Sequence, residues 1–225
     1  MKKIFLLVSI LTLSTLALAE KNVIEVRGGY DLSSSTNFDN DVYSEYDLDK
    51  FVENGFNLGI EYRREILTNF QIGAGIEYRL SDIEQPGNRR VESENINYSY
   101  DSGSLTSIPL YLTARYNFKN ITDFTPYVKV NLGYSINSGD TNVKLNNIYT
   151  GKLVEEYNSD IDNGMYYGFG LGVEYKNFLI DLTYDITQSK AEQKVYNYED
   201  VEGYSDDYKF DIRKLTLSVG YQFEF

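Results

Sequence analysis

LTLSVGYQFEF, the stretch Leu215–Phe225, decides the fold because it alternates strictly between two kinds of residue. Its odd-numbered positions are all apolar or aromatic, whereas small or polar residues such as Gly220 and Gln222 fill the even-numbered ones. Successive side chains of an extended chain point to opposite faces. The pattern therefore predicts a β-strand with one apolar face and one small or polar face.

The same alternation recurs seven more times along the chain. In each segment every second residue, starting from the first, is apolar or glycine, and these positions, 41 in all eight segments, carry no charge. The intervening positions are rich in glycine and in both signs of charge. The eight segments are 24–32, 56–62, 70–80, 108–116, 128–136, 167–175, 178–186 and 215–225.

Which face points inward decides the class of protein. A soluble β-sandwich or a lipocalin, with its apolar face inside, is the main alternative for strands of this kind. Here the polar face is narrow and carries glycine and opposite charges, as a packed interior does, while the apolar face is continuous and built from large residues, as a lipid-facing belt is. We predict an all-β fold, an eight-stranded antiparallel up-and-down transmembrane β-barrel, closed because a lipid-exposed sheet edge leaves unpaired backbone groups in hydrocarbon.

The N-terminus carries the pattern of an export signal. Lys2 and Lys3 precede an apolar run that ends in Ala17-Leu18-Ala19, a small-x-small cleavage pattern. An N-terminal membrane helix is the alternative, but the run is short for a span and the cleavage pattern follows it at once. We expect residues 1–19 to be a signal peptide and residues 20–225 to be the outer-membrane barrel domain. Losing the two lysines takes the formal charge from −13 to −15.

The connections between the segments alternate in length. Those at 64–69, 118–124 and 176–177 are short, whereas those at 33–50, 81–105, 137–163 and 187–211 are long. Outer-membrane barrels have short periplasmic turns and long external loops. We therefore expect both termini in the periplasm, the long loops outside the cell, and strands that continue beyond the membrane as hairpins.

Aromatic residues fall near both ends of the predicted strands. Tyr62, Phe70, Tyr116, Tyr175, Phe178 and Phe223 lie toward the periplasmic side, and Tyr30, Tyr78, Tyr134, Tyr167 and Tyr184 toward the external side. Two such girdles, about 25 Å apart, are typical of the two interfaces of an outer membrane.

Two stretches resemble a known family. The ending Tyr221–Phe225, YQFEF, resembles the C-terminal strand of bacterial outer-membrane proteins, and Ile108–Tyr116, IPLYLTARY, is similar to a strand of the small eight-stranded barrels of the OmpX/Ail and opacity-protein type. The barrel half of OmpA is similar in pattern. The resemblance implies insertion by the barrel-assembly machinery, with Tyr221, Phe223 and Phe225 as the assembly signal.

The composition excludes several kinds of active site. The chain has no His and no Cys, and hence no Ser–His couple, no thiolate nucleophile and no ordinary His or Cys metal site. Asp181 and Asp185 could act as an acid–base pair, but carboxylates on an inner wall among Arg and Lys are more often ion-pair partners. We expect no enzymatic activity, no cofactor and no metal site, and the charge of −13 argues against nucleic-acid binding.

The predicted inner face carries charges of both signs in near-equal numbers. Eight strands leave an interior that side chains can fill, and buried charges must pair. We therefore predict a salt-bridged plug; the alternative is a narrow porin-like channel for small polar solutes. The predicted interior network consists of Glu25, Arg27, Asp31, Glu61, Arg63, Glu77, Arg79, Arg115, Lys129, Glu174, Asp181, Asp185, Lys214 and Glu224.

The net charge resides in the four long loops. Their formal charges are −4, −3, −3 and −4, about −14 together, and they are rich in Tyr, a residue enriched at recognition surfaces. Tyr98, Tyr100, Tyr196 and Tyr198 are the candidates for partner binding; packing of the loops against one another is the alternative. We expect a monomer that acts in adhesion, host-factor binding or envelope support, in contact with outer-membrane lipid and lipopolysaccharide, with an outer-membrane enzyme as the third alternative.

Overall fold

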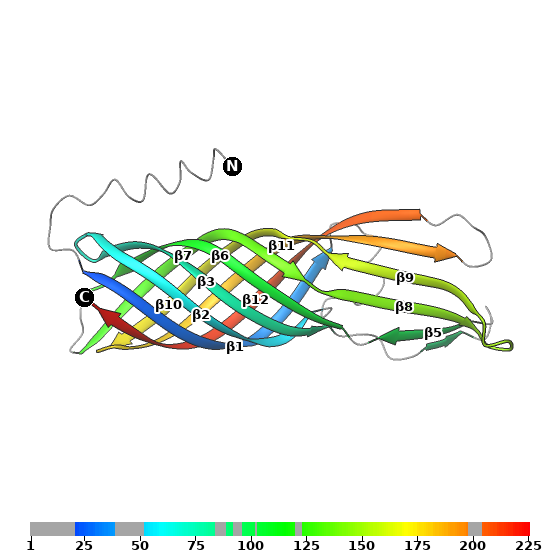
Figure 1. Cartoon of the computed structure of the whole chain (residues 1–225). Coiled ribbons are helices and arrows are strands. Elements are labelled where there is room, and N and C mark those ends of the chain that lie inside the picture. The colour runs from blue at the N-terminus through cyan, green and yellow to red at the C-terminus, as the bar shows by residue number, and fades with distance from the viewer. Residues whose placement is uncertain are drawn as a thin grey trace, which may run out of the picture.

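A computed structural model of the chain describes residues 21–38, 52–83, 89–91, 96–101, 103–119, 123–197 and 204–225. Eight long strands in this part form a closed antiparallel barrel in which neighbours in the chain are neighbours in the sheet, and β1–β12 and β10–β11 pairing completes the ring (Figure 1). The predicted fold is confirmed. The strands are β1 (Asn22–Phe38), β2 (Val52–Leu67), β3 (Phe70–Ile83), β6 (Gly103–Asn117), β7 (Phe124–Ser138), β10 (Gly164–Tyr175), β11 (Phe178–Asn197) and β12 (Tyr204–Glu224).

One end of the barrel, here named the turn end, carries the short connections and the C-terminus. The β2–β3 and β10–β11 turns each contain a residue with positive φ, Asn69 at 67° and Lys176 at 56°. Asparagine tolerates this left-handed conformation better than most residues. At the same end the N–H of Asn22 donates to the carbonyl oxygen of Phe225 at 3.1 Å, which ties the start of β1 to the end of β12.

At the opposite end, here named the loop end, the sheet continues past the barrel (Figure 1). The outer part of β11 pairs with β9 (Leu153–Ile161), and β8 (Asp140–Asn147), β5 (Ile96–Asp101) and β4 (Arg89–Val91) follow in that order. Together with the outer part of β12 these strands form a protruding antiparallel sheet, named the outer sheet below. The β8–β9 and β11–β12 hairpins are the expected continuations of the strands.

The two faces of the barrel wall differ as the alternation predicts. None of the 41 charge-free positions is buried, and large side chains such as Phe56 (69% exposed) and Phe178 (62%) stand on the outside. The intervening polar positions point inward and are mostly buried. This arrangement is the reverse of a lipocalin and matches a wall solvated by lipid. Among the described residues, no helix has the length and apolar character needed to cross a bilayer.

Aromatic rings gather at both rims of the apolar belt. At the turn end, Phe124 packs on Tyr175 and Phe178 on Tyr221, with ring centroids 4.9 and 5.1 Å apart. At the loop-end rim, Tyr30 lies 4.9 Å from Phe56. In outer-membrane barrels such girdles of aromatic residues lie at the two levels where hydrocarbon meets water.

Candidate functional site in the barrel interior and at the loop end

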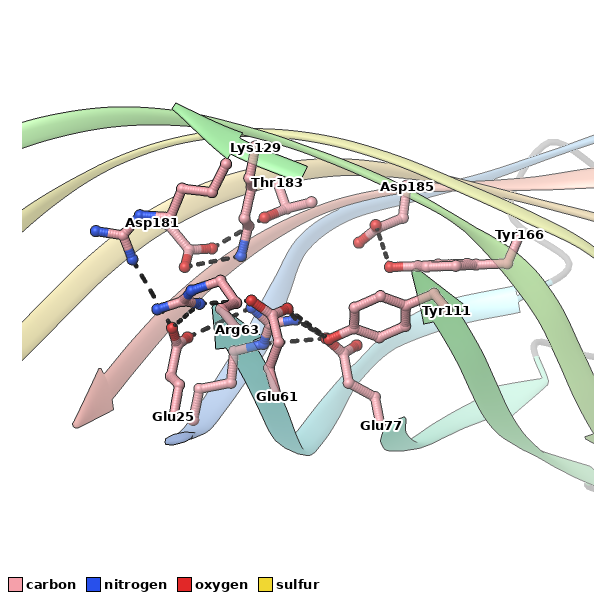
Figure 2. Close-up of polar contacts among 12 residues, drawn as sticks. Glu25, Glu61, Arg63, Glu77, Tyr111, Lys129, Tyr166, Asp181, Thr183 and Asp185 are labelled. Carbon is pink, nitrogen blue, oxygen red and sulfur yellow. Dashed lines mark hydrogen bonds and ion pairs between the residues drawn. The ribbon is translucent and has the colours of Figure 1, made fainter. Parts of the chain in front are cut away.

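The turn-end half of the interior is organised around two carboxylates that face each other. Glu25 of β1 and Glu61 of β2 are directly paired in register and both are buried. Directly opposed like charges are destabilising. One nitrogen of Arg63, Nη1, lies 2.5 Å from a carboxylate oxygen of each, and Arg27 approaches the same two residues at 3.4 and 3.3 Å. The two arginines thus neutralise the opposed acids, and Figure 2 shows Arg63 beside Glu25 and Glu61.

The middle of the interior is a network that spans the barrel. Glu77 of β3 accepts from Arg27 at 2.5 Å and from Arg79 at 2.7 Å. Arg79 continues to Asp185 of β11 at 2.9 Å, and the hydroxyl of Tyr166 donates to the same carboxylate at 2.6 Å. Figure 2 shows Glu77, Tyr166 and Asp185 of this network, which come from three different strands. Because β3 and β11 are four steps apart in the closed ring of eight strands, the contact between Arg79 and Asp185 connects opposite walls of the barrel.

A second group of contacts fills the side formed by β6, β7 and β11. Asp181 accepts from Lys129 at 2.9 Å, from Tyr127 at 3.1 Å and from Thr183 at 2.9 Å. The guanidinium carbon of Arg115 lies 3.6 Å from the centroid of the Tyr127 ring, a cation–π contact in a desolvated site. This acid therefore has its charge and its hydrogen bonds satisfied within the protein.

Toward the loop end the interior polar contacts centre on Asp31. It accepts from Lys214 at 2.6 Å, from Thr216 at 2.8 Å and from the backbone N–H of Gly55 at 3.2 Å. Lys214 also donates to Ser81. Four different strands, β1, β2, β3 and β12, are thereby joined above the central network.

The structure places twelve of the fourteen predicted interior residues inside, each between 1% and 6% exposed. Six are acids, namely Glu25, Asp31, Glu61, Glu77, Asp181 and Asp185, and six are bases, namely Arg27, Arg63, Arg79, Arg115, Lys129 and Lys214. This buried set is formally neutral. Glu174 lies nearer the surface, with its side chain 14% exposed, and contacts Arg115 at 2.5 Å.

Glu224 lies at the edge of the interior network. Its side chain is 34% exposed, pairs with Lys21 at the turn end and accepts a hydrogen bond from the buried Gln222 at 3.0 Å. It is the last residue of β12, where the barrel opens to solvent, so its inward register position is not covered by a further layer of side chains.

Three interior tyrosines complete the network, and sequence reasoning left them out of it. Tyr111 lies 3.1 Å from Glu61 and 3.3 Å from Glu77, and Tyr127 and Tyr166 bind the two aspartates of β11. The rings of Tyr111 and Tyr127 lie directly over Gly75 and Gly172, where a Cβ atom would overlap with them. The alternation of side chains along each strand could have identified these tyrosines, because all three lie on the same strand face as a glycine or a buried charge.

An apolar cluster lies on the inner face at the loop end. It contains Val52, Ile83, Leu105, Ile161, Phe210 and Ile212, all between 0% and 6% exposed. The cluster joins β2, β3, β6, β9 and β12, and hence lies where the barrel passes into the outer sheet. Most of these residues were assigned to long connections at the sequence level, so the reversal of the inner face from charged to apolar was not foreseen.

Three of the four predicted partner-binding tyrosines belong to strands of the outer sheet. Tyr98 and Tyr100 belong to β5 and Tyr196 to β11, whereas Tyr198 lies outside the described residues. The register places residues of five adjacent strands in one row, in the order Tyr100, Val143, Tyr157, Val195 and Tyr204. This row is named the outer row below.

Comparison with known proteins identifies the chain. A family model described as the outer membrane protein beta-barrel domain matches residues 4–223. The chain belongs to this family. It is an integral outer-membrane β-barrel, and the resemblance to the small eight-stranded barrels is confirmed. A curated relative, an uncharacterized protein of Pasteurella multocida (strain Pm70), is 31% identical over 99% of this chain and 98% of its own length.

Solved structures of similar proteins include three small outer-membrane barrels. Ail, the attachment invasion locus protein of Yersinia pestis, is 20% identical over 92% of this chain and 100% of its own, with a TM-score of 0.45. OprG from Pseudomonas aeruginosa is 12% identical over 91% and 95%, with a TM-score of 0.48. Neisserial surface protein A is 14% identical over 90% and 97%, with a TM-score of 0.42.

Proposed function

We propose that this protein is a closed barrel that anchors an acidic, tyrosine-rich surface for interaction outside the cell. In this proposal the loop end faces the exterior and the turn end faces the periplasm. The alternation of short turns and long connections supports that orientation. The interaction is adhesion to a host or bacterial surface, or support of the envelope, by a protein that is monomeric.

The observation that carries the proposal is the neutral, internally bonded interior beneath an apolar cluster. Six acids and six bases bind one another across the lumen, and the cluster at the loop end packs above them. A path for polar solutes needs polar groups that water can reach, whereas these groups are paired and the cluster offers no polar atoms. A closed interior leaves the outer sheet as the part of the molecule able to meet a partner.

The outer sheet supplies the two components that recognition surfaces use. The long connections carry about −14 of formal charge, which favours basic partners or divalent cations and attracts them over a Debye length of about 10 Å at 0.1 M salt. The outer row contributes Tyr100, Tyr157 and Tyr204, which alternate along the row with Val143 and Val195. Tyrosine supplies short-range affinity at low cost in conformational entropy.

The experiment compares binding by whole cells that express defined variants. Deleting Arg89–Asp101 removes β4 and β5 and leaves β8, β9, β11 and β12 paired, so the barrel and most of the outer sheet are kept. Replacing Tyr149, which is 81% exposed in the β8–β9 turn and lies off the outer row, with serine is the matched control. Adhesion to matrix-coated surfaces and to other bacteria is then measured against the full-length and null strains.

We expect the deletion to lower adhesion toward that of the null strain and the Tyr149→Ser variant to keep it. Full adhesion by the deletion variant would move the activity away from this part of the outer sheet. A null strain that adheres as well as the full-length strain would remove the adhesive role and favour envelope support.

Two further measurements address the closed interior and the orientation. Refolded protein in planar bilayers should show little conductance, and conductance should rise when Glu61 and Arg63 are neutralised together. Large, stable channels from the unmodified protein would favour the narrow-channel function instead. Because the chain has no cysteine, a Lys152→Cys variant can be labelled on intact cells with a membrane-impermeant maleimide. Absence of labelling would overturn the proposed orientation.

A further inference from the structure

The three tyrosines of the outer row occupy every second strand of the outer sheet. They belong to β12, β9 and β5, and the valines of β11 and β8 lie between them. Neighbouring strands are about 4.8 Å apart, so Tyr204, Tyr157 and Tyr100 follow one another at intervals of about 10 Å. Directly paired residues share one face of a sheet. The outer row is therefore a line of regularly spaced aromatic positions on a single face.

A row of hydrogen-bonding residues runs beside the outer row. Two residues closer to the barrel along each of β8, β9, β11 and β12, the paired positions hold hydroxyl, amide and carboxylate side chains. Because side chains alternate along a strand, these positions share the face of the outer row, at a distance of about 7 Å from it. They are named the polar row and consist of Thr141, Ser159, Gln193 and Asp206.

Together the two rows have the chemistry that a sugar chain requires. A pyranose ring offers C–H groups on its faces, which pack on aromatic rings, and hydroxyl groups at its edge, which bind to hydroxyl, amide and carboxylate groups. In a β-1,4-linked chain the rings alternate in orientation, and the two-sugar repeat is about as long as the interval of about 10 Å between the tyrosines. Every second sugar therefore meets a tyrosine, and the smaller Val143 and Val195 leave room for the sugars between.

The charge of the surroundings restricts the sugar chain to a neutral one. The long connections carry about −14 of formal charge, and the polar row itself contains Asp206. Like charges repel over a Debye length of about 10 Å at 0.1 M salt, so sulfated and other acidic chains are disfavoured.

The twist of the sheet restricts the physical form of the sugar chain. Neighbouring strands of a sheet are rotated by about 20–25°, so successive tyrosines are rotated by about 45°. A single soluble chain is able to turn with the outer row, whereas the flat surface of a crystalline polysaccharide meets one tyrosine at a time.

We propose that the outer row and the polar row bind a soluble, neutral, β-1,4-linked polysaccharide, with one tyrosine beneath every second sugar. The inference rests on the proposed function, since it names the chemical class of the partner for the same outer sheet. An aromatic contact of this kind contributes about twofold to tenfold in affinity. A chain whose first, third and fifth sugars lie on the three tyrosines therefore binds far more tightly than a disaccharide that reaches one.

The test is isothermal titration calorimetry of protein refolded in a detergent without a sugar headgroup. The first two probes are cellobiose and cellohexaose, which differ in length alone. The third is maltohexaose, which has the same glucose units as cellohexaose but a different repeat because of its α-1,4 links. The fourth is a heparin hexasaccharide, which is polyanionic.

The variant carries both Tyr157→Val and Val195→Tyr. It keeps the number of tyrosines in the outer row and changes their intervals from about 10 and 10 Å to about 5 and 15 Å. Valine and tyrosine both favour strands, so the outer sheet is retained. The matched control is Tyr149→Ser, in the exposed β8–β9 turn off the outer row. Gel mobility before and after heating verifies that each barrel is folded.

We expect the unmodified protein to bind cellohexaose at least about tenfold more tightly than cellobiose, because two further tyrosines are reached. Maltohexaose and the heparin hexasaccharide should bind no better than cellobiose. The double variant should lose about threefold to tenfold in affinity for cellohexaose, the value of one aromatic contact, and keep its affinity for cellobiose. The Tyr149→Ser variant should match the unmodified protein.

Equal affinity of the unmodified protein for cellohexaose and maltohexaose would overturn the inference, and so would unchanged affinity of the folded double variant for cellohexaose. Failure of cellohexaose to bind at concentrations up to about 10 mM would also overturn it, since weak stacking contacts correspond to a dissociation constant of about 1 mM. If the deletion of Arg89–Asp101 abolishes adhesion while cellohexaose does not bind, the proposed function stands and the sugar chain is not the partner. Full adhesion by that deletion variant would instead concern the proposed function, so the two failures are distinguishable.

Discussion

Replacing Arg63 with methionine should destabilise the folded barrel by about 3–5 kcal/mol, the usual cost of removing one partner from a buried ion pair. Arg63 is 1% exposed and bridges Glu25 and Glu61 at 2.5 Å each. At an effective dielectric constant of about 20, charges about 4 Å apart attract by about 4 kcal/mol, so two such attractions are lost while one desolvation cost is removed. Glu61 would then keep only Arg27 as an ion-pair partner among the described residues, and Glu25 would keep Arg27 at 3.4 Å and Arg115 at 4.0 Å.

The loss is measured as the free energy of unfolding in urea from phosphatidylcholine vesicles. The chain has no Trp, so far-ultraviolet circular dichroism and gel mobility are the suitable probes. Arg213→Met is the matched control, because Arg213 is only partly buried and its contact with Asp211 is long, at 3.5 Å; it should cost less than about 1 kcal/mol.

A double variant separates the loss of charge balance from the loss of packing. Combining Arg63→Met with Glu61→Gln removes one base and one acid of the same strand, so the buried set stays formally neutral and Glu25 keeps its contact with Arg27. Neutral replacements of a buried charge pair are often tolerated, so most of the stability should return. The reasoning fails if Arg63→Met costs less than about 1 kcal/mol, or if the double variant is as unstable as the single one.

Three further predictions concern the packing of the barrel and its assembly in the membrane. Gly75→Ala should cost about 1–3 kcal/mol in the same urea assay because its methyl group meets the Tyr111 ring, whereas Gly28→Ala, which meets only ordinary contacts, should cost less. Phe210→Ala should cost about 3–5 kcal/mol by leaving a cavity in the loop-end cluster, and a loss below about 1 kcal/mol would mean that the cluster is loosely packed. Deleting Phe225 should lower the amount of folded protein in outer-membrane fractions of expressing cells, and unchanged levels would argue against its role in the assembly signal.

The barrel could be predicted because the alternation of inward and outward side chains extends over the whole wall. Every second residue has the same surroundings, so a charge-free face that runs through eight segments leaves one arrangement compatible with a bilayer. Parity also identified most of the buried charges, such as Arg63 and Asp185, without any knowledge of their partners. The short connections then fixed which strand ends lie together.

Contacts across the lumen could not be predicted, because they depend on stagger between strands that are distant in the sequence. Glu77 binds Arg27 of β1 as well as Arg79 of its own strand, and only the three-dimensional register brings Arg27 to it. A local irregularity has a similar effect. The register shift between Asp31 and Ser33 reverses which side chains of β1 point inward. Thr36 is therefore buried, whereas unbroken alternation from Asp31 would bury Ser35 and Asn37 instead.

Tyr166 was missed because of the residue at which the sequence segment was taken to begin, and not for a physical reason. It shares a face with Gly168, but the sequence segment was started one residue later, at Tyr167. The apolar cluster was missed for a different reason. Its members Ile83, Leu105 and Ile161 point inward at the loop end of their strands. An apolar residue there can belong to either face, so polarity does not reveal which side chains point inward.

The distribution of charge explains how a strongly acidic chain can form a membrane-spanning wall. An unpaired charge inside the barrel costs several kcal/mol, so the interior is held close to neutrality, and the described interior indeed has six acids and six bases. A charge in the long connections is solvated and costs little, so nearly all of the excess, about −14, can accumulate there. Substitutions in the loops can therefore change the outer surface without disturbing the wall. Any change of a single interior charge has to be matched by a second change of a charge that it contacts, on the same strand, as for Glu61 and Arg63, or on another strand, as for Arg79 and Asp185.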